Sequence, residues 1–448
     1  MLARLLVPQT DATMVTIRWG TVERSSDDRP ESEAVAVMRA PAPEVVRLLA
    51  AQALRAAGYG FTAVILGGLL SGRGYAPVAA GLLLAAMVAG TTWLSVLVGM
   101  FADRWGRRRT YAALYLLLAV SGLVFAVVDW YPALLAVALA GMLSTDVIDN
   151  GPATTIEQAI LAGQRRPDAR RFGVYNAVAA LAGSLGALAA GLPGLAPTAA
   201  LFLVLVPIGL AGALLAVRLP GTVEVRSHAG DAARPGLSRS RTTVTRLAAL
   251  FAVDAFAGGF IVQSFIAYWL AARFDVPLTA LGPLFFTLGL AQTVSFLLAP
   301  WLAGRFGLLP VMVFTHLPSN LLLAAVAFAP TFPAAAALLL ARGLLSQMDV
   351  PTRQAYVMAL VDVHERTAAA AVTNAARYTV RPLGPLLAGL TAGIAQGAPF
   401  LLAGALKSGY DLTLWAWFRR VPLADHETGE SAPQDLRQGA HGRTSASS

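Results

Sequence analysis

The sequence predicts an all-α polytopic membrane protein, with twelve transmembrane helices arranged as two pseudo-symmetric six-helix halves. The first observation is composition: 56% of the 448 residues are hydrophobic and 13% are charged, whereas about a quarter of the residues in soluble proteins are charged. The second is a succession of apolar runs of roughly 20 residues, the length of a helix that crosses a bilayer. The third is that motifs of the first half return in the second.

The apolar runs define the helices and leave the polar segments between them. In a first half, residues 45–217, we expect helices at 45–71, 76–101, 110–129, 132–160, 171–192 and 197–217. In a second half, residues 244–418, we expect them at 244–272, 277–303, 308–329, 333–360, 367–393 and 399–418. The polar remainder is then a disordered cytoplasmic N-terminal extension (1–44), a cytoplasmic linker (218–243) and a disordered cytoplasmic tail (419–448).

Three motifs recur at a nearly constant spacing. The segment GMFADRWG at 99–106 aligns with PWLAGRFG at 300–307, and LGALAAGL at 185–192 aligns with LGPLLAGL at 383–390. The third pair is Asn150-Gly151-Pro152 with Asp349-Val350-Pro351. The offsets are 201, 198 and 199 residues. A long repeat of this kind predicts two related halves that are parallel in the membrane.

The arginines fall on one side of the predicted membrane. They are concentrated in the loops at 104–109 and 165–171, in the linker and after helix twelve, whereas the opposite loops contain only Arg73 and Arg273. Cytoplasmic loops of membrane proteins are rich in Lys and Arg. We therefore place both termini in the cytoplasm and the protein in the inner, or plasma, membrane of a bacterial-type cell.

Several chemistries are excluded by what the sequence lacks. There is no cysteine, the five histidines are scattered, and the motifs of nucleotide-binding loops, serine hydrolases and zinc proteases are absent. We expect no enzyme activity, no catalytic residue, no metal site and no cofactor. The net charge of +9 reflects the loop arginines and does not indicate nucleic-acid binding. The expected partners are the lipid bilayer, a small-molecule substrate and protons, and we expect a monomer.

A short charged loop joins the second and third predicted helices. Glycines at its two ends permit a tight turn and close helix packing. The loop resembles the G-x-x-x-D-(R/K)-x-G-(R/K)-(R/K) signature of the major facilitator superfamily, which lies between that family's second and third helices. The matching residues, expected to form a gating loop, are Gly99, Asp103, Arg104, Gly106, Arg107 and Arg108.

The resemblance covers about residues 45–420 and implies the family's fold and mechanism, in which two halves rock about a substrate site at the membrane midplane. It implies that Asp103 docks against the N-terminus of helix eleven, at the 362–367 turn, in the outward-facing state. The second copy of the loop has Gly304 in place of Asp103, so the gating role is expected for the first copy alone. Antiporters of the family often carry G-P-x-x-G-G on helix five. Here the fuller version, at 384–389, is on helix eleven, which leaves the direction of transport open.

Ionisable residues inside the predicted helices are candidates for function, because such charges are costly and usually face a cavity or a partner. The proton-coupling candidates are Asp146, Asp149, Asp254 and Arg55. Asp146 and Asp149 share one face of helix four, and Arg55 lies at a matching depth on helix one. We expect an Arg55–Asp149 pair and an Asp254–Arg353 pair. Each pair either fixes helix packing or exchanges its arginine for a proton, since the arginine favours the charged carboxylate and burial favours the neutral one.

A second group of residues is predicted to line the substrate cavity. Glu157 lies nearer the cytoplasm, a position that also suits an inner gate with Arg107. Lys407 and Asp411 are one turn apart on helix twelve, the spacing of a pair that neutralises itself. The cavity candidates are Asn150, Glu157, Gln263, Arg342, Asp349, Arg353, Arg377 and Arg381.

The leading functional interpretation is a secondary active transporter that exports a small organic solute in exchange for protons. Proton-coupled uptake of an anionic metabolite is the alternative, because Arg342, Arg377 and Arg381 offer positive charge inside the membrane. A non-transporting receptor or scaffold on the same fold is a more distant alternative. The intact Asp103 loop argues against it, since a protein that does not cycle has little use for a gate.

Overall fold

The structure is a computed structural model that describes residues 43–146, 151–162, 169–224, 237, 240–361 and 365–421. Within these residues every regular element is a helix and there is no strand, which confirms the all-α prediction. Nearly all of the predicted N-terminal extension, and most of the linker and tail, lie outside the described residues.

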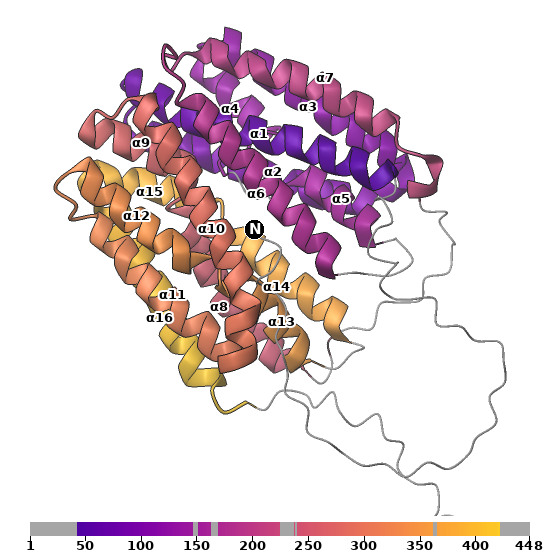
Figure 1. Cartoon of the computed structure of the whole chain (residues 1–448), viewed down its shortest axis with the longest axis vertical. Helices are drawn as coiled ribbons and strands as arrows, with labels where there is room; N and C mark the ends of the chain where they lie inside the picture. The colour runs from indigo at the N-terminus through magenta and orange to yellow at the C-terminus, as the bar shows by residue number, and fades with distance from the viewer. Residues whose placement is uncertain are drawn as a thin grey trace, which may run out of the picture. The chain divides into compact units, whose positions relative to one another are not determined.

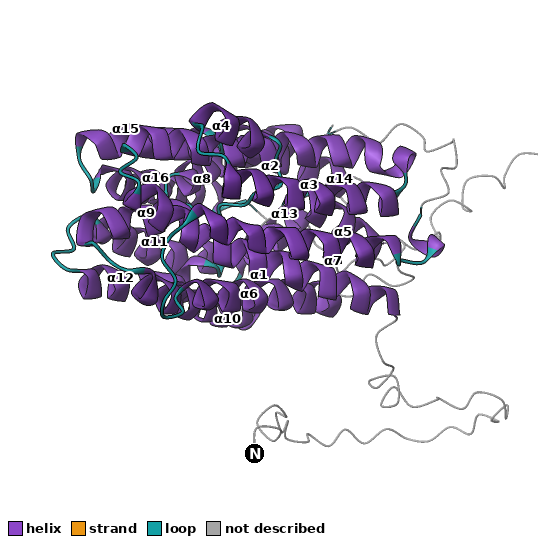
Figure 2. Cartoon of the chain, turned by 90° about the horizontal axis from the view of Figure 1, so that it is seen from above, coloured by secondary structure: helices purple, strands orange, loops and turns teal. Residues whose placement is uncertain are grey.

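The helices of the first half are the indigo-to-magenta elements of Figure 1, and Figure 2 shows many of them side by side along a common direction. They are α1 (Pro43–Gly72), α2 (Pro77–Trp105), α3 (Arg107–Val127), α4 (Tyr131–Leu139), α5 (Pro152–Ala162), α6 (Ala169–Ala190), η2 (Ala199–Val204) and α7 (Leu205–Val217), followed by the single turn η3 (Gly221–Val223).

The helices of the second half run to the yellow end of the chain in Figure 1. They are α8 (Arg241–Gly259), α9 (Gln263–Phe274), α10 (Leu278–Phe306), α11 (Leu308–Val326), α12 (Phe332–Ser346), α13 (Asp349–Leu360), α14 (Arg366–Val380), α15 (Leu383–Ile394) and α16 (Ala398–Phe418).

Each of the twelve predicted ranges contains helix in the structure. By length and composition, seven helical stretches of the described chain are long and apolar enough to cross a membrane. The total of twelve spans and the boundaries of the two halves stay predictions. The all-α membrane fold itself agrees with the prediction.

Four predicted helices are interrupted, which the apolar pattern did not reveal. The range 132–160 contains α4 and α5, 244–272 contains α8 and α9, 333–360 contains α12 and α13, and 367–393 contains α14 and α15. At three of these interruptions the local residues suit helices poorly. Gly141, with φ of 86°, follows α4, Gly258 and Gly259 end α8, and Pro382 separates α14 from α15.

Glycines let helices of different halves approach each other closely. A Cβ added at Gly389 of α15 would lie 2.4 Å from the backbone oxygen of Pro77 on α2, and one added at Gly282 of α10 would lie 2.6 Å from Cα of Gly191, just after α6. Such distances leave no room for a side chain, so these positions favour glycine for steric reasons. The glycine-rich segment at 384–389 therefore serves helix packing.

The extensive contacts between the halves are concentrated at one end of the bundle. They join α1 with α9, α2 with α15 and α6 with α10, close to the loops predicted to be external. There the Tyr268 hydroxyl donates to the backbone oxygen of Tyr75 over 2.9 Å. By contrast, the extensive contacts of α5, α13 and α14 are with helices of their own half. The two halves are thus in contact at the predicted external end.

Candidate functional site

A charged cavity of about 270 Å³ lies among the second-half helices and reaches Asp146 of the first half. Helix interruptions fall beside it, because α8 and α9, and α12 and α13, contribute lining residues, and Arg381 of the lining lies between α14 and α15. In membrane carriers, broken helices at mid-membrane mark binding sites. The ionisable residues that line the cavity are Asp146, Asp254, His316, Arg342, Asp349, Arg353, Arg377, Arg381 and Lys407.

Asp254 of α8 is the hub of this charge network. Its carboxylate accepts from Lys407 Nζ over 2.5 Å, from Arg377 over 3.2 Å and from Arg353 over 3.3 Å. Three helices, α13, α14 and α16, are thereby tied to α8. The Asp254–Arg353 pair predicted from the sequence is confirmed.

The α12–α13 helix pair supplies one further cation, Arg342, and one further carboxylate, Asp349. Arg353 also donates to Asp349, one turn before it on α13, over 2.6 Å. Arg342 of α12 is buried, and its Nε has no hydrogen-bond partner. Among the described residues, Arg342 has no ion pair either. The cavity thus contains a buried guanidinium with unused donors.

Asp146 connects the two halves across the cavity. Its carboxylate accepts from Arg381, at the end of α14, over 2.7 Å and from the backbone N–H of Gln263, at the start of α9, over 2.9 Å. The N-terminus of a helix favours a negative charge, so α9 and Arg381 hold this carboxylate together. Next to it, the backbone N–H of Ser264 donates to the backbone oxygen of Thr145 over 3.1 Å.

A buried histidine of the cavity lining, His316, is paired with a buried carboxylate. His316 Nδ1 of α11 lies 2.9 Å from Asp411 Oδ1 of α16, and Asn320 Nδ2 donates to Asp411 Oδ2 over 2.8 Å. The predicted Lys407–Asp411 pair is therefore wrong. Lys407 instead reaches across to Asp254, which is already surrounded by cations and offers a second carboxylate oxygen.

The first half contains a separate buried cluster away from the cavity. Arg55 of α1 donates to Glu157 of α5 over 2.8 Å, and the hydroxyls of Tyr111 and Tyr175 donate to the same carboxylate over 2.6 and 2.5 Å. Glu157 is 0% exposed. The structure thus pairs Arg55 with Glu157, while the expected partner, Asp149, lies outside the described residues, as does Asn150.

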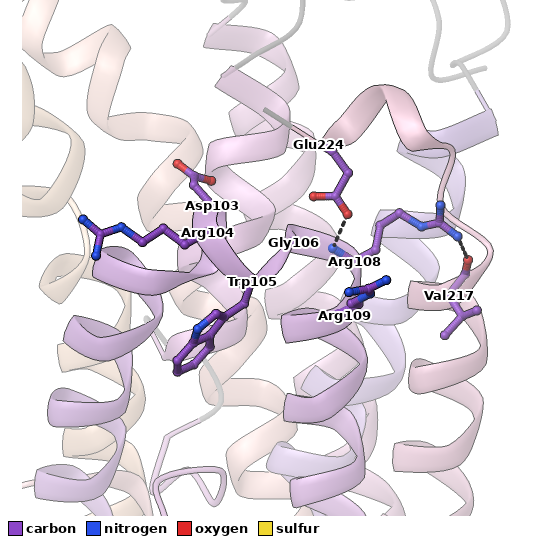
Figure 3. Close-up of a pocket in the computed structure, with 8 residues that line it drawn as sticks. All are labelled: Asp103, Arg104, Trp105, Gly106, Arg108, Arg109, Val217 and Glu224. Atoms are coloured by element: carbon purple, nitrogen blue, oxygen red, sulfur yellow. Dashed lines mark hydrogen bonds between the residues drawn. The ribbon is translucent and has the colours of Figure 1, made fainter. Parts of the chain in front are cut away.

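The predicted gating loop lines a hollow of about 560 Å³ at the start of α3. Figure 3 shows Glu224 reaching the first residues of α3, where it accepts from the backbone N–H groups of Arg107 and Arg108 over 2.7 and 3.2 Å. Arg108 in turn donates to the backbone oxygen of Val217. Glu224 caps the helix N-terminus, an interaction that the sequence analysis missed because Glu224 is remote in the chain.

The predicted docking of Asp103 against helix eleven is not tested, because residues 362–364 lie outside the described chain. In this structure Asp103 accepts from Arg107, one turn later, over 2.7 Å, and its side chain is half exposed. Glu157 was also expected near Arg107. The carboxylate is instead in the Arg55 cluster, and Arg107 contacts the backbone oxygen of Ala159 over 3.5 Å.

Of the predicted cavity residues, Gln263, Arg342, Asp349, Arg353, Arg377 and Arg381 line the cavity, together with Asp146 and Asp254 from the proton-coupling group. The sequence analysis missed His316 and Asn320. A histidine and an asparagine one turn apart in an otherwise apolar helix were the available signal. Both residues contact Asp411 of α16, and a single sequence does not show which helix faces are in contact.

Comparisons with known proteins agree with this architecture. The model of the Major Facilitator Superfamily matches residues 48–385. An uncharacterized membrane protein of Saccharomyces cerevisiae, YJR124C, is 24% identical over 423 residues, which cover 84% of this chain and 94% of the yeast protein.

Several solved structures of membrane transporters are similar in fold. The nucleoside transporter NupG gives a TM-score of 0.63 at 16% identity, covering 83% of this chain and 97% of its own. A bacterial homologue of the iron transporter ferroportin in an inward-facing state gives 0.64 at 15%, with 85% and 99% covered. The inward open xylose transporter XylE from E. coli gives 0.62 at 14%, with 85% and 97% covered. At these identities the likeness concerns the fold alone.

Proposed function

Because the chain belongs to the major facilitator superfamily, we propose that it is an alternating-access carrier of a small organic anion. One observation carries the substrate class. Five permanent cations line the cavity against three carboxylates, which leaves two positive charges in excess. The cations are Arg342, Arg353, Arg377, Arg381 and Lys407, and the carboxylates are Asp146, Asp254 and Asp349.

An excess of buried positive charge is costly in a membrane unless something neutralises it. Arg342 is the clearest case, since it is buried beside the cavity and its Nε lacks a partner. A guanidinium presents parallel donors that fit a carboxylate or phosphate group. A solute anion would therefore supply the partner that the protein itself does not.

The volume of the cavity favours a small solute. Pockets for drug-sized ligands measure roughly 300–1,000 Å³, whereas this one is about 270 Å³. The polar lining, which includes Gln263, Gln292 and Gln347, suits hydroxyl or carbonyl groups on the same solute.

The position of the contacts between the halves supports alternating access. The halves touch near the loops predicted to be external, so with both termini in the cytoplasm this conformation faces inward. The Asp146–Arg381 bond joins the two halves within the cavity. Rocking of the halves would break that bond, and each partner would then be free for a proton or for the solute.

Proton-coupled efflux of a solute of another class is the second candidate function. It is favoured by the Asp146 side chain, which is 24% exposed in the cavity and is therefore accessible to protons. A cationic or neutral solute would leave the excess of positive charge without a partner, which is why we rank it second.

The substrate class is tested by thermal unfolding of the purified protein with matched solutes, followed by flux into liposomes. We expect succinate and gluconate to stabilise the protein more than succinamide and glucose. We expect Arg342→Gln to weaken anion binding by about tenfold or more, the effect of one lost charge-assisted hydrogen bond. The control is Arg305→Gln, an exposed arginine at the end of α10, which should change nothing.

Two results would contradict the proposal. Stronger stabilisation by the neutral or a cationic analogue would overturn the substrate class. Anion binding without flux in liposomes would instead favour a receptor or scaffold on this fold.

A further inference from the structure

The His316–Asp411 pair occupies a position that suits a proton carrier. His316 is 3% exposed and Asp411 is 0% exposed, yet His316 lines the cavity. We assign Asp411 as ionised, and an ionised carboxylate can only accept hydrogen bonds. With Oδ1 at 2.9 Å, the ring hydrogen is then on Nδ1. The other ring nitrogen, Nε2, is then the atom that can take up a proton.

The surroundings of the pair are charged on several sides. Asp411 is directly opposite the ring, and Lys407, the cation on the same helix as Asp411, is engaged by Asp254 over 2.5 Å. Helix α10 packs against α11 and contributes the uncharged Gln292 to the cavity. The ionisable groups that face His316 or share its cavity are Lys407, Tyr410 and Asp411 on α16, Asp254 on α8, Arg342 on α12, Asp349 and Arg353 on α13, Arg377 and Arg381 at the end of α14, and Asp146 from the first half.

Counting charges around the cavity shows what a proton on His316 would do. When Asp411 is included with the cavity lining, five permanent cations face four carboxylates. One positive charge is then in excess while His316 is neutral, and two are in excess when it is protonated. A monovalent anion balances the first state, whereas a divalent anion balances the second.

We propose that His316, held by Asp411, takes up one proton when a dianionic solute binds, so that proton and dianion cross the membrane in the same direction. This inference rests on the proposed transport of an organic anion and specifies its coupling. Its sign follows from linkage: a proton that strengthens anion binding must itself be bound more tightly when the anion is present. An inward proton gradient would thus drive uptake.

The roles of the other buried groups differ from that of His316. Asp254 is bound by three cations, and Asp349 is paired with Arg353. Protonation of either carboxylate would leave a cation without its anionic partner. His316 can be charged without breaking its bond to Asp411, because Nδ1 donates in both of its protonation states.

The experiment compares His316→Gln with wild type in liposomes, using radiolabelled succinate, malate and inorganic phosphate, each alone. Two fluxes are measured: accumulation driven by an imposed pH gradient, and exchange of labelled for unlabelled anion without a gradient. In wild type we expect a gradient of about one pH unit to raise accumulation about tenfold, because one proton crosses with each anion and supplies the free energy of that gradient. In His316→Gln we expect that increase to vanish while exchange continues at a lower rate, because the glutamine amide can still donate to Asp411 but cannot supply the positive charge that balances a dianion.

Two controls separate coupling from packing. Ser319→Ala alters another buried polar residue of α11 and should leave the response to the pH gradient intact. A pH-sensitive dye inside the liposomes gives the direction of proton movement, which a merely structural role of His316 would not affect.

The outcomes distinguish this inference from the proposed function. If wild type transports the anions and His316→Gln keeps the full response to the gradient, the inference is overturned and the proposed function stands. Proton movement opposite to that of the anion would also overturn it. If wild type moves none of the anions but does move a neutral solute, the proposed function fails and the inference fails with it.

Discussion

The carboxylate of Asp254 links several helices of the second half. It accepts hydrogen bonds from Lys407, Arg353 and Arg377 and is 4% exposed. These three cations come from different helices, so the carboxylate fixes the packing of the second half as well as the charge of the cavity. Removing one member of a buried charge network strongly destabilises a protein, because the remaining charges stay buried without a partner.

We predict that Asp254→Asn strongly destabilises the protein, by about 3–5 kcal/mol, because it leaves buried cations without their anion. The measurement is thermal unfolding in detergent. The matched control is Asp129→Asn, which breaks the exposed Arg73–Asp129 pair of 2.6 Å and should leave the unfolding temperature unchanged. Equal effects of the two substitutions would show that Asp254 is not a structural hub.

The sequence identified the charged residues of the cavity better than it identified their partners. Arg342, Arg377 and Arg381 could be selected because charges in apolar helices are rare. Their partners depend on how each helix is rotated about its axis, which packing against neighbours decides. Hence Lys407 was matched with the nearby Asp411, although the structure places it against Asp254, 153 positions away in the chain.

At the scale of helices, the sequence predicted the ranges of the helices but not the interruptions within four of them. An apolar run of the right length predicts a span whether or not its hydrogen-bond ladder is continuous. The breaks between α8 and α9 and between α14 and α15 depend on glycine and proline in a tertiary context. These breaks expose backbone groups to the cavity, as where the Gln263 N–H binds Asp146.

The close crossing of α2 and α15 predicts a change in conformation on substitution. Gly389→Val should push the two helices apart, since a Cβ at this position would lie 2.4 Å from the backbone oxygen of Pro77. The predicted external end would then open and the outward-facing population would rise. Because the chain has no cysteine, Ser346→Cys in the cavity can report this as faster labelling by an external, membrane-impermeant thiol reagent.

The control for this experiment is Gly409→Val on α16, where an added Cβ would meet no atom within 4 Å. It should leave the labelling rate at that of Ser346→Cys alone. If Gly389→Val does not increase external labelling, the α2–α15 contact is not the external closure.

At the scale of the whole molecule, the family and the fold followed from composition, repeats and one loop. The conformational state, inward-facing or outward-facing, did not follow from the sequence, because it depends on which end of the two halves is in contact. The α1–α9, α2–α15 and α6–α10 contacts identify that end. Naming it external still relies on the distribution of arginines.

Topology is therefore the prediction on which the inward-facing interpretation depends. A reporter fused after Arg234 should lie in the cytoplasm, and one fused after Pro330 should lie outside, because the loops on the first side carry the arginines. The measurement uses a phosphatase and a fluorescent protein as complementary reporters at each site. At each site, one of the two reporters should be active and the other inactive. If the locations were reversed, the contacts between the halves would lie at the cytoplasmic end, the structure would represent an outward-facing state, and the cavity would load its anion from outside.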